Sequence, residues 1–172
     1  QVAEAELMGR LDLRRGICDL SDARLIPVKR LRSIDRILVT ACGTAWHAAL
    51  YAKSALEELG RIPTEVALAS ELRYGSTPID RRTLLLAVSQ SGETADTLAA
   101  TRMAREKGAV ALAVTNVKGS SLSREADGVL FMRAGLEIGV AATKTYLSQL
   151  LSLLLLALHV GTARGSVDPA RR

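Results

Sequence analysis

The sequence predicts an α/β fold, a five-stranded parallel sheet that is doubly wound, in a flavodoxin-like three-layer sandwich. Five short apolar runs alternate with helix-forming segments from residue 36 onward, and this alternation is typical of parallel sheets. The run 84–88 is apolar at every position instead of every second one. We therefore expect helices to cover both faces of that strand.

The first strand is predicted over residues 37–39, in the run Ile-Leu-Val. A helix is expected over 44–59, because Thr44 is a suitable N-cap and Gly60 a suitable C-terminal stop. The remaining strands are expected at residues 65–68, 83–88, 109–114 and 129–132, and the remaining helices at 94–107 and 141–160. In the helix 94–107 the acids lie early and the bases late, as the helix dipole favours. Right-handed crossovers and the commonest small topology predict the strand order 2-1-3-4-5.

The domain organisation follows from where this pattern begins and ends. A chain of 172 residues is long enough for one domain. Residues 36–161 carry the strand and helix pattern, so we assign the domain to them. Residues 1–35 lack strong periodicity and are interpreted as a linker or lead-in, and residues 162–172 as a tail.

Composition and spacing exclude several classes of protein. The net charge of +5 is spread along the chain without a Lys/Arg stripe, so we expect no nucleic-acid ligand. Two cysteines and two histidines lack the spacing of a metal site, so no metal is expected. The longest apolar run, Leu147–Val160, has 14 residues and is too short to span a bilayer. We expect this run to form a buried or subunit-facing helix. No stretch resembles a signal peptide, so we expect a cytoplasmic protein without membrane contact.

Polar loops follow the first and third predicted strands. Residues 89–94 read Ser-Gln-Ser-Gly-Glu-Thr, where a strand passes into a helix N-terminus. Free N–H groups, the helix dipole and hydroxyls together form a site for an anion such as a phosphate monoester. Cys42-Gly43-Thr44 brings another hydroxyl to the same edge of the sheet. The strand order reverses between these strands, which is where such folds bind ligands.

Other interpretations of these loops exist. Serine and threonine are also ordinary helix caps and turn residues, but their occurrence in both loops favours a site. The motifs Gly-x-Gly-x-x-Gly and Gly-Lys-Ser/Thr are absent, so we expect no nicotinamide or nucleotide cofactor. Residues 137–144 could form a third wall of the site or a simple glycine turn, and the sequence alone favours neither.

Four segments resemble a known family. They are Ala41–Thr44, Ala69–Tyr74, Ser89–Thr97 and Glu137–Ala141. In this order and spacing they resemble the first sugar-isomerase (SIS) domain of the glutamine–fructose-6-phosphate aminotransferase family, over roughly residues 36–160. The segment 89–94 is shared by SIS domains generally, whereas the second and fourth segments point more narrowly to the aminotransferases.

The resemblance implies a hexose 6-phosphate ligand of the fructose 6-phosphate or glucosamine 6-phosphate type. By analogy, Ser89, Gln90, Ser91 and Thr94 would hold the phosphate, and Thr44, Ala45, Val140 and Ala142 would line the sugar. Ala45 and Ala142 depart from the family, where serine is common. Each loses a hydrogen bond worth about 1 kcal/mol.

The resemblance also implies partners that the segments above do not supply. In the family, a glutaminase domain releases ammonia, and a second SIS domain with a C-terminal tail supplies the catalytic groups. We therefore expect this chain to bind sugar phosphate without turnover, to carry no catalytic residue of its own, to need no cofactor and to form a homodimer.

Two alternatives stay open. One is a stand-alone aldose–ketose phosphate isomerase, which would take its base from Glu71, Glu93, Glu137 or His47. The other is a sugar-phosphate-sensing regulatory domain, for which residues 1–35 are too short and irregular to form the usual DNA-binding module.

Overall fold

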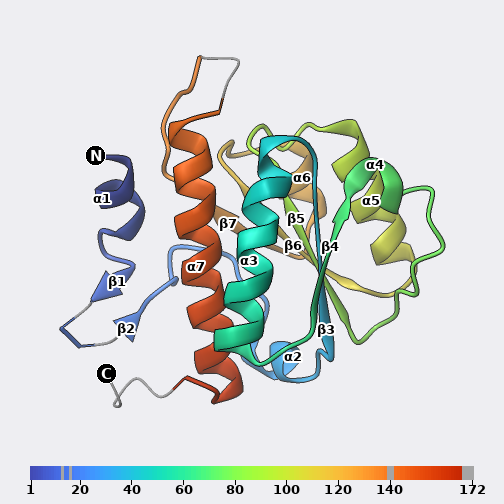
Figure 1. Ribbon diagram of the computed structural model, residues 1–172, viewed down its shortest axis with the longest axis horizontal. Coiled ribbons are helices and arrows are strands. Elements are labelled where there is room, and N and C mark those ends of the chain that lie inside the picture. Colours follow the sequence, from blue (N-terminus) through green and yellow to red (C-terminus); the bar gives the residue numbers. More distant parts are fainter. Residues whose placement is uncertain (13, 16, 139–141, 168–172) are drawn as a thin grey trace.

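The computed structural model describes residues 1–12, 14–15, 17–138 and 142–167. Its main sheet has five parallel strands in the order β4-β3-β5-β6-β7 (Figure 1). In chain order this is 2-1-3-4-5, so the predicted fold class and strand order are confirmed. The strands are β3 (Arg36–Ala41), β4 (Thr64–Leu68), β5 (Thr83–Val88), β6 (Val110–Thr115) and β7 (Gly128–Phe131).

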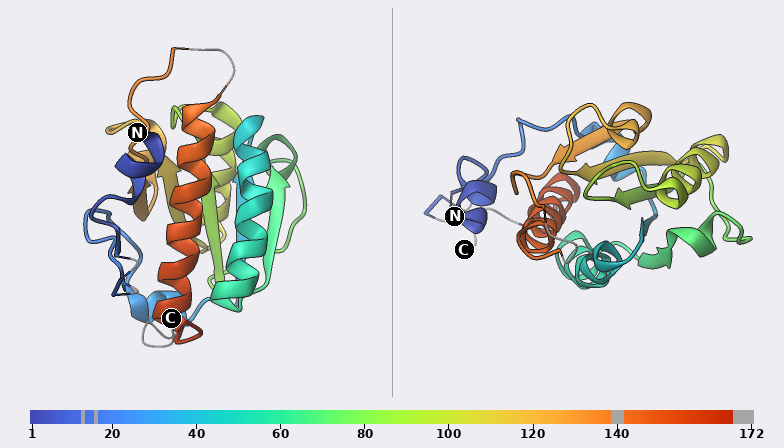
Figure 2. Two further views of the ribbon diagram at one scale, coloured as in Figure 1. Left: turned by 60° about the vertical axis from the view of Figure 1, so that its left-hand side comes forward. Right: turned by 90° about the horizontal axis from the view of Figure 1, so that it is seen from above.

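Helices cover both faces of this sheet, and the sheet lies between them when it is viewed from above (Figure 2). The long helices are α3 (Thr44–Gly60), α5 (Ala95–Glu106) and α7 (Lys144–Arg164); the short ones are α1 (Val2–Leu7), α2 (Val28–Arg32), α4 (Ala69–Leu72) and α6 (Ser121–Glu125). Leu84 and Leu86 of β5 pack in one core with α3 and α7, and Leu85 and Ala87 pack in the other with α5. Both faces of β5 are thus buried, as its continuous apolarity predicts.

From residue 36 onward, the elements differ from the predicted ones in their bounds and in two additions. α4 and α6 are short helices of four and five residues that the apolar pattern did not indicate. α7 begins at Lys144, three residues later than predicted, and continues to Arg164. The register pairs Ala41 of β3 with Val88 of β5, and Val88 with Val114 of β6. The carboxyl ends of these strands therefore form one level edge, from which the polar loops emerge.

The segment 1–35, interpreted from the sequence as a linker or lead-in, folds against the domain. It contains α1, α2 and an antiparallel hairpin of β1 (Leu11–Asp12) and β2 (Ile17–Cys18). α1 lies along α7, as the views from two sides show (Figures 1 and 2). The apolar side chains Leu20, Ile26 and Leu31 of this segment join the core on the α7 side of the sheet.

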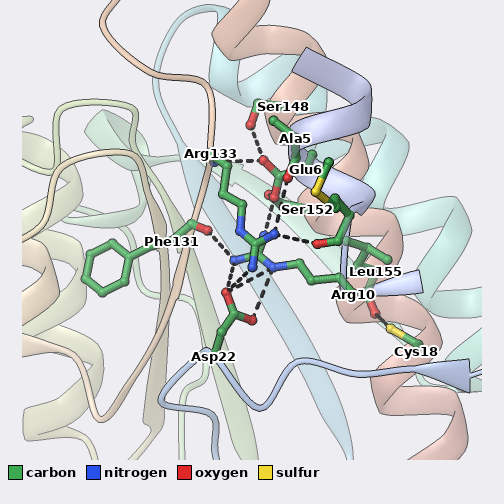
Figure 3. Close-up of polar contacts among 11 residues, drawn as sticks. Ala5, Glu6, Arg10, Cys18, Asp22, Phe131, Arg133, Ser148, Ser152 and Leu155 are labelled. Atoms are coloured by element: carbon green, nitrogen blue, oxygen red, sulfur yellow. Dashed lines mark hydrogen bonds and ion pairs between the residues drawn. The ribbon is translucent and has the colours of Figure 1, made fainter. Parts of the chain in front are cut away.

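A buried polar cluster ties α1 to α7 (Figure 3). The Glu6 carboxylate is fully buried and accepts hydrogen bonds from the hydroxyls of Ser148 (2.6 Å) and Ser152 (2.7 Å). It also accepts from the backbone N–H of Arg133 at 2.8 Å and forms an ion pair with Arg10. A buried charge is tolerated only when it is paired and its hydrogen bonds are satisfied, and Glu6 meets both conditions.

α7 is longer than the apolar run in the sequence suggests. Among the described residues it is the one helix whose length of 21 residues and hydropathy would allow it to cross a membrane. In its most apolar window, 61% is buried inside the fold, where α7 packs against α3 and α1. Core helices of soluble proteins have the same length and composition, so the burial of α7 identifies it as a core element here.

Candidate functional site

Hydroxyl groups of the turn between β5 and α5 stabilise it through hydrogen bonds within the turn. Ser89, which is 4% exposed, accepts a hydrogen bond from the Gly92 N–H at 3.1 Å, and its Oγ lies 2.9 Å from the Thr94 Oγ1. Ser91 accepts from the Glu93 N–H at 3.2 Å. Serine and threonine side chains commonly brace turns in this way. The side chain of Ser89 therefore mainly stabilises the turn. The side chains of Ser91 and Thr94 are only partly buried.

The carbonyl groups of the same turn are paired on its far side. The Gln90 carbonyl accepts from the Asn116 N–H at 3.0 Å, and the Gly92 carbonyl accepts from the Leu122 N–H at 3.0 Å. These acceptors would repel a phosphate, and both are already engaged by the segment that follows β6. Thr94 is the N-cap of α5, and its side chain makes no capping hydrogen bond to that helix. The first N–H groups of α5 therefore remain without a side-chain partner, which favours an anion there.

Gly92 is required by both conformation and space. Its φ of +66° lies in the left-handed region, which only glycine adopts at no steric cost. A Cβ atom at this position would lie 2.2 Å from the Ser120 Oγ and 2.8 Å from the Thr115 Oγ1. The turn can approach the β6–α6 connection this closely only because residue 92 has no side chain.

A pocket of about 180 Å³ lies between this turn and the end of β3. Its lining residues are Cys42, Thr44, Ala45, Val88, Ser89, Gln90, Ser91, Thr94, Ala142 and Gln149. None of these side chains carries a formal charge. A ligand here would meet hydroxyls, amides and a helix N-terminus, which suits a phosphate ester without lysine or arginine.

The third wall of the pocket comes from α7 and the segment before it. Glu137 accepts hydrogen bonds at 3.1 Å and 3.0 Å from the N–H groups of Thr143 and Lys144, at the start of α7. It also accepts from the hydroxyl of Thr145. That hydroxyl, followed by the groups at residue 143, lowers the pKa of Glu137 to about 2. Glu137 therefore caps α7 and holds Ala142 beside the pocket.

A scan of protein families matches residues 30–159 of the chain to the SIS domain. This match covers well over half of the chain. The chain belongs to the SIS domain family. The assignment agrees with the family that the four sequence segments resemble.

The chain is also similar to individual curated proteins. The chain is 51% identical over 160 residues to the glutamine–fructose-6-phosphate aminotransferase (isomerizing) of Streptomyces coelicolor, a match that covers 93% of the chain and 26% of that protein. It is also 51% identical to the Symbiobacterium thermophilum enzyme of that name, over 95% of the chain and 27% of that protein. The chain thus spans about a quarter of the length of the curated relatives it matches.

A solved structure confirms the fold. The C-terminal domain of glucosamine-fructose-6-phosphate aminotransferase from Francisella tularensis superimposes with a TM-score of 0.91 at 32% sequence identity. The match covers 99% of this chain and 47% of that one. The SIS fold that the resemblance implies is therefore shared with a domain of an aminotransferase.

The SIS domain brings seven of the eight predicted ligand-binding residues around one pocket. They are Thr44, Ala45, Ser89, Gln90, Ser91, Thr94 and Ala142. The eighth, Val140, lies outside the described residues. Their contact with a ligand stays a prediction. Sequence reasoning missed Gln149, because a single glutamine in a leucine-rich helix gives no pattern that separates it from the core.

The four candidate bases of the alternative isomerase are not poised at the pocket. None of them is among the described residues that line it. Glu93 accepts the Ser121 N–H at 2.7 Å, and this hydrogen bond lowers its pKa. Glu137 is engaged in capping α7, Glu71 is exposed on α4, and the Nδ1 of exposed His47 lies 3.3 Å from the Gly43 carbonyl oxygen.

Proposed function

We propose that this SIS domain binds a hexose 6-phosphate, of the fructose 6-phosphate or glucosamine 6-phosphate type, as the first half of the isomerase part of a glutamine–fructose-6-phosphate aminotransferase. One observation carries the proposal: an uncharged pocket at the edge where the strand order reverses, with the turn 89–94 and the N-terminus of α5 on one side. Its donors suit a phosphate, and the sequence similarity to the aminotransferases supports a hexose.

The domain anchors the substrate and does not by itself convert it. Isomerising a 2-keto sugar to an aldose moves a proton between C1 and C2, which needs a base with a suitable pKa. Two of the candidate bases, Glu93 and Glu137, are held ionised by hydrogen bonds at helix N-termini and have lowered pKa values. They are weak bases. Binding energy from the phosphate instead positions the reacting carbons for groups that another domain supplies.

The partners in this proposal are a second SIS domain, a glutaminase domain and a second copy of the chain. The limited share of the relatives' length that the chain spans supports the two further domains. Leu50 and Tyr51 of α3 and Leu147 of α7 are each at least 41% exposed, which supports a homodimer that covers these helices. A cytoplasmic location is part of the same proposal.

Calorimetric titration of the 172-residue chain tests the proposal. We expect saturable binding of fructose 6-phosphate and none of fructose, because the phosphate provides the anchor. We also expect no glucosamine 6-phosphate to form when glutamine and fructose 6-phosphate are added to the chain alone. Equal binding of fructose and its phosphate, or turnover by the isolated chain, would overturn the proposal.

A further inference from the structure

Gln149 lies on the second turn of α7 and lines the same pocket as Thr44 and Ser91. Its side chain is 2% exposed, and its amide oxygen has no hydrogen-bond partner among the described residues. We propose that Gln149 binds a hydroxyl of the sugar and so distinguishes a hexose phosphate from other phosphates. This inference rests on the proposed function and adds a specificity residue to it.

The unpaired amide differs from three hydroxyls close to it on α7. Thr145 donates to Glu137, and Ser148 and Ser152 donate to Glu6. Their hydroxyls are all satisfied within the protein. A buried polar group without a partner destabilises a fold. An unpartnered amide at the wall of a pocket therefore indicates a partner that arrives with the ligand.

The chemistry of the amide points to the sugar end of that ligand. An amide oxygen only accepts hydrogen bonds, and a phosphate ester near neutral pH carries almost no proton to donate, since its second pKa is about 6. A sugar hydroxyl, in contrast, both donates and accepts. If the amide turns over and presents its NH₂ group, a hydroxyl still pairs with it. A hydroxyl thus satisfies Gln149 in either orientation.

The neighbouring positions strengthen the assignment. Ala45 and Ala142 line the pocket near Gln149 and lack the hydroxyl that a serine would bring. From the turn 89–94, the side chains of Ser91 and Thr94 line the pocket and are the ones proposed to hold the phosphate. Of the side chains that line the described pocket outside this turn, Gln149 carries the one amide, and it can reach the ligand from α7.

The test measures by calorimetry the affinities of fructose 6-phosphate and of hexyl phosphate. Both ligands are titrated into the wild-type chain and into Gln149→Met, a variant that keeps the length of the side chain but removes the amide. We expect the variant to bind fructose 6-phosphate about tenfold more weakly, as for the loss of one hydrogen bond. Hexyl phosphate, which has the ester but no hydroxyls, should bind within about twofold of wild type. Leu153→Met, one turn further along α7 and in the core, is the matched control and should change neither affinity.

Each outcome of this test supports or overturns the role proposed for Gln149. An equal loss of affinity for both ligands would show that Gln149 only shapes the wall of the pocket. Unchanged affinities would show that Gln149 does not touch the ligand. Either result overturns the inference and leaves the proposed function standing. Wild-type chain that binds neither ligand would overturn the proposed function itself, and the inference with it. If Gln149→Met does not fold, a crystal structure with fructose 6-phosphate takes its place. There, a Gln149 amide more than about 3.5 Å from every sugar hydroxyl would overturn the inference.

Discussion

The hydroxyl of Ser148 donates a hydrogen bond of 2.6 Å to the carboxylate of Glu6, although 142 residues separate them in the chain. The neighbour of Ser148 is Gln149, which faces the pocket. Glu6 also accepts from the N–H of Arg133, at the start of the segment that leads to Glu137. The N-terminal helix thus holds the third wall of the pocket at two points, one on α7 and one after β7.

The replacement Glu6→Ala should destabilise the fold by about 3 kcal/mol or more, because it leaves Arg10 buried beside unpaired hydroxyls. Arg10 keeps its contacts with Asp22, at 2.7 Å, and with the Phe131 carbonyl, at 2.8 Å. The loss of stability should therefore lie at the lower end of the range for breaking a buried ion pair. Urea unfolding measures it. Glu4→Ala, on the exposed side of the same helix, should change the free energy of unfolding by less than about 0.5 kcal/mol. Equal effects of the two variants would contradict the role of Glu6.

Gly92→Ala should unfold the turn that carries the proposed phosphate site. The new Cβ would lie 2.6 Å from the Ser120 Cβ and 2.2 Å from its Oγ, so the turn must move away from the β6–α6 connection. We expect a loss of fructose 6-phosphate binding by calorimetry and a lower melting temperature. Gly119→Ala is the control, since Gly119 has a φ of +76° but open space around its Cβ position. It should show only the conformational penalty of about 1–2 kcal/mol and normal binding.

Ser89→Ala and Ser91→Ala should separate stability from binding. Ser89→Ala removes the acceptor of the buried Gly92 N–H, so it should lower the free energy of unfolding by about 1–3 kcal/mol. Ser91 is only partly buried, and Ser91→Ala should leave stability nearly unchanged while weakening fructose 6-phosphate binding about tenfold or more, as for a hydrogen bond to a charged group. Paired unfolding and calorimetric measurements show the split. The reverse pattern would refute the assigned roles.

The acid sensitivity of α7 should depend on Glu137. Its pKa falls from an ordinary value of 4.5 to about 2 in the folded chain, because hydrogen bonds from Thr145 and Thr143 favour the ionised form. A folded pKa below the unfolded one means that this contribution is complete above pH 4.5 and is lost as the pH falls toward 2. The stability difference between wild type and Glu137→Gln should therefore shrink over this range. Urea unfolding at pH values across this range measures the effect, and a constant difference for Glu137→Gln would refute the cap.

Much of the fold could be predicted because its strands are apolar on both faces. Leu84–Val88 is apolar at all five positions, and this pattern requires helices on two sides whatever else the chain contains. The loops after β3 and β5 could be predicted as a site for a similar reason. The carboxyl ends of parallel strands share one edge, so Thr44 and Ser91 had to lie near each other once the strand order was known.

The remaining features depend on contacts between distant residues, which no local pattern records. Glu6 lies in α1 and Arg10 in the turn that follows it. In the sequence they are four residues apart and look like an ordinary exposed pair. Their burial follows only from where α1 docks on α7. Gln149 likewise acquires its meaning from the position of α7 beside the pocket. α6 is a five-residue helix, too short to show a hydrophobic period.

A crystal of the chain soaked with fructose 6-phosphate would show where the ester lies. We expect the phosphate above the turn between β5 and α5, with its oxygens within about 3.2 Å of the Ser91 and Thr94 hydroxyls and of the N–H groups at the start of α5. An ester bound at any other part of the chain, or a turn left empty at saturating ligand, would contradict it.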